Sequence, residues 1–93
     1  MRLNEEPYRL SIARPAARSL TELLPPKIAA AIYTFITGPL IENPHRVGKP
    51  LRPPLDPTWS ARRGEYRVLY LIDDSSRTVK VTAIRHRGHA YNI

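Results

Sequence analysis

The sequence predicts an α+β fold in which helices pack on one face of an antiparallel sheet. Apolar residues between positions 16 and 36 recur with helical spacing, whereas those at 66–72 and 78–84 are spaced as in strands. Turn-forming residues at 73–77 separate the two strand segments, which favours a hairpin. Helices that precede a run of strands are typical of an α+β domain, and 93 residues suffice for one.

The first half of the chain predicts a strand followed by a helical hairpin. Residues 8–13 alternate apolar and polar side chains, as a half-buried strand does. Two helices are predicted at 16–24 and 27–37, separated by Pro25 and Pro26, and so short a connection makes them fold back on each other. Residues 44–57 contain five prolines, which lack the donor that a sheet requires, so an extended irregular loop is predicted there.

The second half predicts three strands, at 58–63, 66–72 and 78–84, with Gly64 in the first turn. The segment 66–72 is apolar on both faces, which argues for a central strand. The predicted order is therefore β-α-α-β-β-β: an N-terminal strand, a helical hairpin and a three-stranded antiparallel meander. Residues 1–93 are interpreted as a single domain.

Charge is the most informative bulk property. The formal net charge is +7, and residues 45–93 carry ten Lys and Arg against four Asp and Glu, whereas residues 1–44 carry five against four. Twelve of the fifteen cations are arginines, which suit planar, bidentate contacts with phosphate. The concentration of charge in one half favours a polyanionic partner, most often nucleic acid.

Other chemistry finds little support. The sequence has no cysteine, and its three histidines have no acidic residue beside them, so neither a metal site nor a cofactor is expected. The four glycines are scattered and form no phosphate-binding loop. The longest apolar run, 28–36, is too short for a membrane span, and the N-terminus has two glutamates where a signal peptide would be apolar. A cytoplasmic protein without a membrane partner is expected.

The segment 84–91, IRHRGHAY, holds the residues best suited to chemistry on RNA. RNA is cleaved when its own 2′-hydroxyl attacks the adjacent phosphate, a reaction that histidine assists by proton transfer and arginine by stabilising charge. The candidates are Arg85, His86, Arg87 and Tyr91. In an extended chain His86 would face away from Arg85 and Arg87, but a turn near Gly88 would change that, and a solvated basic terminus remains the alternative.

Arg67 interrupts the otherwise apolar segment 66–72. An arginine in such a strand must reach solvent, an anion or an acidic side chain, and the acids nearest in sequence are Glu65, Asp73 and Asp74. Taken alone, Arg67 is better explained by a salt bridge than by a bound phosphate.

Three segments together resemble the RelE/ParE superfamily of bacterial toxins, and most closely its RelE branch of actinobacterial type. They are the basic loop NPHRVGKPLRPPL, the stretch WSARRGEYRVLYLIDD and the terminal IRHRGHAY, and the likeness extends from about Tyr8 to Tyr91. Its more specific parts are the pattern Gly-x-Tyr-Arg-(apolar)₂-Tyr and the terminal basic-x-Arg-x₃-Tyr. The resemblance implies a type II toxin that cuts messenger RNA in the ribosomal A site, without metal, until a co-expressed antitoxin neutralises it.

The resemblance also implies roles for individual residues. Arg67 would contact the scissile phosphate, Arg85 or Arg87 would add positive charge, and Tyr91 would position the nucleotide. His86 becomes the candidate for proton transfer, because Thr58 and Ser60 stand where some members carry a Lys-x-Lys pair that supplies the base. The cations expected to bind ribosomal RNA or the message are Lys49, Arg52, Arg62 and Arg63.

Partners and alternatives follow from the same likeness. The expected partners are a cognate antitoxin, messenger and ribosomal RNA, and operator DNA bound only by the toxin–antitoxin complex. Two alternatives stay open: a ParE-like inhibitor of DNA gyrase without enzymatic activity, and a degenerate, non-toxic corepressor that binds an antitoxin. The nuclease interpretation requires Arg67 and the terminal arginines to lie on the same face of the sheet.

Overall fold

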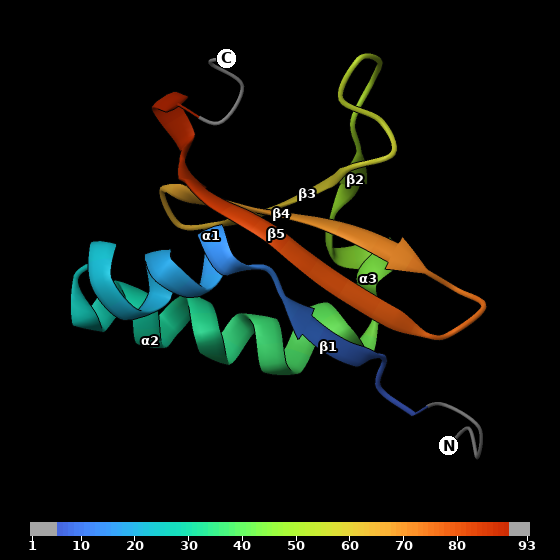
Figure 1. The fold of residues 1–93 in the computed structure, drawn as a ribbon, viewed down its shortest axis with the longest axis horizontal. Coiled ribbons are helices and arrows are strands. Elements are labelled where there is room, and N and C mark those ends of the chain that lie inside the picture. The colour runs from blue at the N-terminus through green and yellow to red at the C-terminus, as the bar shows by residue number, and fades with distance from the viewer. Residues whose placement is uncertain (1–5, 90–93) are drawn as a thin grey trace.

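Residues 6–89 are described by a computed structural model, in which helices cover one face of a five-stranded sheet (Figure 1). The strands are β1 (Arg9–Ile12), β2 (Lys49–Pro50), β3 (Trp59–Arg63), β4 (Tyr66–Asp73) and β5 (Thr78–His86). The helices are α1 (Arg14–Arg18), continued by the wider turn η1 (Ser19–Leu23), α2 (Pro26–Phe35), continued by η2 (Ile36–Leu40), and the short α3 (Pro44–Val47) and η3 (Arg87–His89). The predicted α+β class, with a helical hairpin on one sheet face, is confirmed.

The sheet has the strand order β1-β5-β4-β3-β2. The predicted meander forms its centre, whereas β1 crosses to the far edge and pairs in parallel with β5. The segment 44–57, predicted to be irregular, contains both α3 and β2. Pro44 opens α3, where no donor is required, and Pro50 lies in an edge strand, so these prolines do not obstruct the two elements.

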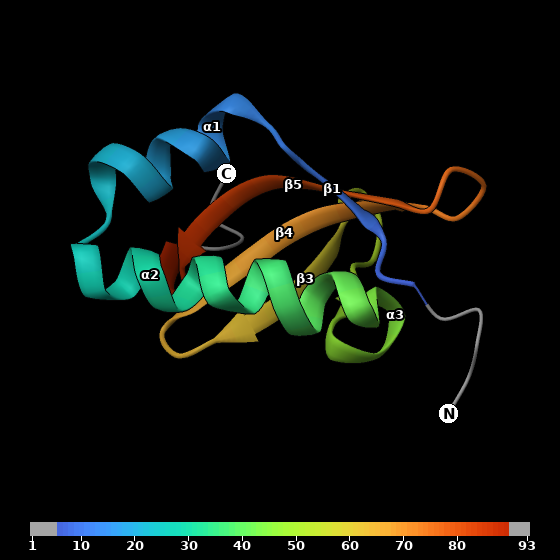
Figure 2. The same ribbon diagram turned by 90° about the horizontal axis from the view of Figure 1, so that it is seen from below.

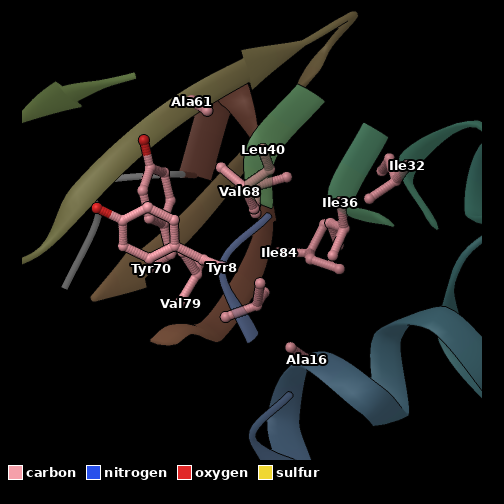
Figure 3. Packing of buried hydrophobic residues seen from close by; sticks show 11 residues of the cluster. Tyr8, Ala16, Ile32, Ile36, Leu40, Ala61, Val68, Tyr70, Val79 and Ile84 are labelled. Carbon is pink, nitrogen blue, oxygen red and sulfur yellow. The ribbon is translucent and has the colours of Figure 1, made fainter. Parts of the chain in front are cut away.

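The core lies between the helices and one face of the sheet, as Figure 3 shows. The helices contribute Ala16, Ile32, Ile36 and Leu40, and the strands contribute Ala61, Val68, Tyr70, Val79, Val81 and Ile84, all buried. In Figure 2 α2 crosses this face of the sheet, so its apolar stripe meets strands β3 to β5. We call the opposite side of the sheet, which α1 and α2 leave uncovered, the open face. Within residues 6–89 no helix is long and apolar enough to span a membrane.

Three polar side chains tie the start of β1 to α3 and to the turn after β4. The Tyr8 hydroxyl donates a 2.5 Å hydrogen bond to one oxygen of Asp74, and the His45 ring nitrogen lies 3.0 Å from the other. The bond from Tyr8, with a smaller contribution from His45, lowers the pKa of the Asp74 carboxyl. Asp74 and its neighbour Asp73 therefore stabilise the far end of the sheet, at the opposite end of β4 from Arg67.

Tyr70 is fully buried, and its hydroxyl donates a 2.6 Å hydrogen bond to the Pro44 carbonyl, which links β4 to α3. Burial raises the pKa of Tyr70 to about 12. The folded protein thus keeps this proton when the unfolded chain, titrating near 10, has lost it. Stability from Tyr70 is complete below pH 10 and declines as the pH rises towards 12, by about 2–3 kcal/mol in all.

Tyr70→Phe should therefore lower the free energy of unfolding by about 1–3 kcal/mol at neutral pH, because the buried Pro44 carbonyl loses its donor. Between pH 10 and 12 the variant should lose less stability than the parent. Urea denaturation across this pH range measures both effects. The pKa of Tyr8 is also raised, mainly by its bond to Asp74, but Tyr8 is present in both proteins and so does not cause a difference between them. Parallel pH curves would contradict the role given to Tyr70.

Candidate nucleic-acid interface on the open face

Three arginines form a row across the three central strands. The register places Arg62 of β3 directly opposite Arg67 of β4, and Arg67 directly opposite Arg85 of β5. Directly opposed residues share a face of the sheet with their Cβ atoms about 5 Å apart. Because the neighbouring positions Ala61, Val68 and Ile84 are buried under the helices, the row lies on the open face.

A one-residue bulge in β5 aligns this row. Asp73 pairs with Thr78. Arg67 lies six residues before Asp73 and Ile84 six residues after Thr78, so uninterrupted antiparallel pairing would place Ile84 opposite Arg67. The register instead shifts between Leu69 and Tyr70, and the extra residue on β5 is Thr82. The shift turns Arg85 onto the open face and Ile84 into the core.

Beside the row lies a hollow of about 460 Å³, which we call the cationic hollow. It is lined by Val47, Gly48, Lys49, Pro50, Leu51, Arg52, Ser60, Arg62 and Arg67. Four of these are cations, and no carboxylate is among the described residues that line it. Like charges held this close repel one another, and an anion bound between them relieves the repulsion. The hollow is suited to a phosphate group.

The structure separates two of the predicted site residues from this hollow. Arg63 and His86 both lie opposite Tyr66, which places them on the helix side of the sheet. The His86 ring packs edge-on against Tyr66, with ring centroids 5.3 Å apart, and its Nδ1 accepts a 3.3 Å hydrogen bond from the Gly88 backbone. The expectation of an imidazole beside the arginine pair is thus not met by His86, because β5 stays extended through this residue.

Arg87 belongs to a different contact. Its backbone N–H donates a 2.7 Å hydrogen bond to the Glu65 carbonyl, and its guanidinium lies 3.9 Å from the Glu65 carboxylate, with both side chains exposed. Of the two candidates, Arg85 is therefore the arginine that lies beside Arg67, and Arg87 is not. Tyr91 lies outside the described residues.

From the sequence, Ser60 is placed at one position of the Lys-x-Lys pair but is given no part in this surface. Ser60 is buried, pairs with Lys49 and Leu69, and lines the cationic hollow two positions before Arg62. Its two-residue offset from Arg62, the period of a strand, was the available signal. The arrangement as a whole concentrates positive charge around the planar guanidinium of an arginine. Such an arrangement is suited to binding a phosphodiester group.

Comparison with known proteins identifies the family of this chain. Residues 10–91 match the protein family described as the ParE toxin of type II toxin–antitoxin systems, parDE. The chain belongs to this family. Within it, the toxin is of the RelE type, being 49% identical to Toxin RelE of Mycobacterium tuberculosis over 97% of this chain and 92% of that protein. It is also 48% identical to Toxin RelG of the same organism over 91% and 97% of the two chains.

A solved structure supports the same assignment. The RelE-type toxin superposes with a TM-score of 0.82 and 49% identity on a chain of the toxin–antitoxin complex RelBE2 from Mycobacterium tuberculosis. The match covers 88% of this toxin and all of that chain. The RelE/ParE resemblance noted from the sequence is confirmed, and so is the fold.

Proposed function

We propose that this toxin is a ribosome-dependent endoribonuclease that cuts messenger RNA in the A site and so stops translation. The observation that carries the proposal is the aligned row of Arg62, Arg67 and Arg85 beside the cationic hollow. Its RelE-type relatives support the toxin role. In the cell such an enzyme acts in the cytoplasm, where its substrate is translated.

In the proposed reaction the 2′-oxygen attacks the adjacent phosphorus while its proton passes to a base. The P–O5′ bond breaks, and the departing oxygen takes up a proton, which leaves a 2′,3′-cyclic phosphate and a 5′-hydroxyl. Arg67 and Arg85 would stabilise the extra negative charge that develops on the phosphorane oxygens, which is often the largest single contribution to catalysis. No metal or other cofactor is part of the proposal.

Other residues would position the substrate. Lys49, Arg52 and Arg62 would hold the neighbouring phosphates of the message or of ribosomal RNA, and Tyr91 would orient the nucleotide. We assign His86 an indirect role: its bond with the Gly88 backbone shapes the turn that leads from β5 into the C-terminal segment. Arg63, on the helix side, would contact ribosomal RNA only from that side.

The proposed protein partner is a cognate antitoxin, since a relative at 49% identity has been crystallised as a toxin–antitoxin complex. An acidic segment of the antitoxin would cover the cationic hollow and exclude RNA from it. Operator DNA would be bound by the complex rather than by the free toxin, whose open face is adapted to single-stranded RNA in this proposal.

The test is cleavage of a translated message. Purified toxin added to ribosomes paused on a defined message should produce breaks in the A-site codon, mapped by primer extension, with cyclic phosphate at the new 3′ ends. Naked message without ribosomes serves as the control. Intact message on the ribosome, together with growth arrest on expression, would contradict the proposal.

A gyrase inhibitor is the second candidate, favoured by the ParE description of the matching family. It predicts inhibited supercoiling by purified DNA gyrase with intact message, so the same toxin preparation tested in both assays separates the two functions. Absence of growth arrest would instead favour the non-toxic corepressor.

A further inference from the structure

A second hollow of about 230 Å³ lies on the open face, next to the cationic hollow. It is lined by Leu51, Leu55, Thr58, Leu69, Thr82, Ala83 and Arg85. The two hollows share Leu51, and Arg85 belongs to the arginine row. We call the second one the apolar hollow, because its walls are mainly aliphatic.

The loop 51–58 forms one wall of the apolar hollow, and backbone hydrogen bonds hold it in shape. The Leu51 N–H donates to the Thr58 carbonyl at 2.9 Å, and the Thr58 N–H donates to the Leu55 carbonyl at 3.0 Å. In Figure 1 this loop stands above the sheet on the side away from the helices, as does the end of β5. Its half-buried leucines, Leu51 and Leu55, therefore face the open side of the sheet.

The bulge in β5 forms the floor of the apolar hollow. In regular pairing successive residues point to opposite faces, yet Thr82 and Ala83 both line this hollow. Both side chains are small, so the space above them stays open. The Thr82 hydroxyl donates a 3.2 Å hydrogen bond to the Leu69 carbonyl, which leaves its oxygen lone pairs able to accept one.

These features fit a flat, apolar group with polar edges that is linked to a phosphate. Aliphatic walls and a guanidinium plane stack on a nucleobase, and threonine hydroxyls bond to its edges. We propose that the apolar hollow binds the base of the nucleotide next to the scissile phosphate, and that Ala83 limits which base enters. The inference rests on the proposed RNA substrate and adds the element that would set sequence preference.

Binding of short RNA tests the inference without cleavage. A fluorescent ribotrinucleotide should bind the toxin about tenfold more tightly than the same backbone lacking its middle base, since stacking of one base is worth roughly that much or more. Ala83→Leu, which fills the hollow, should reduce this ratio to about one while affinity for the abasic RNA is unchanged. Ser11→Leu, an apolar substitution towards the far end of the open face, is the matched control and should keep the ratio.

Cleavage mapping supplies a second readout. Ala83→Leu should change the set of codons that the toxin cuts on the ribosome, whereas Ser11→Leu should not. If Ala83→Leu fails to fold, as judged by its thermal melt, Leu55→Ala in the loop wall takes its place and should lower the ratio by opening the hollow.

The outcomes distinguish this inference from the proposed function. A base-dependent affinity that Ala83→Leu abolishes, without any cleavage, supports the hollow and overturns the nuclease. If the toxin cleaves the message but binds both RNAs equally, and Ala83→Leu (or Leu55→Ala in its place) leaves the set of cut codons unchanged, the apolar hollow does not bind a base. The proposed nuclease activity is then unaffected.

Discussion

Replacing Arg67 by alanine should lower the single-turnover rate of message cleavage by about 10²–10³-fold, the usual effect of removing one group that stabilises an oxyanion. Arg67 occupies the central strand, with Arg62 on one side and Arg85 on the other, so its loss removes the middle of the row. Arg67→Lys keeps the charge but not the planar fork, and should recover only part of the rate.

The matched control is Arg9→Ala, which removes one exposed arginine from the same face at the far end of the sheet. It should leave the rate within about twofold, because its distance from the row exceeds the Debye length of about 8 Å at physiological salt. Arg85→Ala should resemble Arg67→Ala, and Arg87→Ala should resemble the control, since Arg87 is paired with Glu65. Equal rates for Arg67→Ala and Arg9→Ala would remove the row from the mechanism.

Gly48→Ala should destabilise the fold by about 3 kcal/mol, whereas Gly38→Ala should leave stability unchanged or raise it by about 0.5–1 kcal/mol. A methyl group on Gly48 would lie 2.2 Å from the Tyr70 hydroxyl and 2.8 Å from the Ser60 carbonyl, and one on Gly38 would meet nothing within 4 Å. Tyr70 would have to move away from Pro44, and the buried hydrogen bond between them would break.

A double-mutant cycle tests this explanation. The shortest contact of the added methyl is with the Tyr70 hydroxyl, so Gly48→Ala should cost less in a Tyr70→Phe background than in the parent. Urea denaturation of the four proteins at neutral pH gives the coupling energy. Strictly additive losses would mean that the Ser60 carbonyl of β3, rather than Tyr70, resists the substitution.

The hairpins of this protein were predictable because the chemistry that forms them is local. Gly64 has a positive φ of 61° in the two-residue turn before β4, and Asp73 accepts hydrogen bonds from the Ser75 and Ser76 backbone in the turn before β5. Both features favour the observed turns over alternatives. Arg67 stood out for the same local reason, as a charge within an apolar strand, but its role in a site was implied only by the family resemblance.

The partners of Arg67 depended on features that a single sequence does not encode locally. Regular pairing from the Asp73 turn would have brought Ile84, not Arg85, opposite Arg67, and only the bulge at Thr82 corrects this. The same reasoning separates His86 from the row, since each residue of an extended strand faces away from its neighbour. The parallel pairing of β1 with β5 is decided by packing between segments about 70 residues apart.

The position of β5 in the sheet has a consequence for biosynthesis. This strand follows all the other strands in sequence, yet it lies between β1 and β4 and carries Arg85. During synthesis on the ribosome, β1 has no strand to pair with until β5 has left the exit tunnel. The sheet, and with it the alignment of Arg85 with Arg67, is therefore completed only after this last strand has been synthesised.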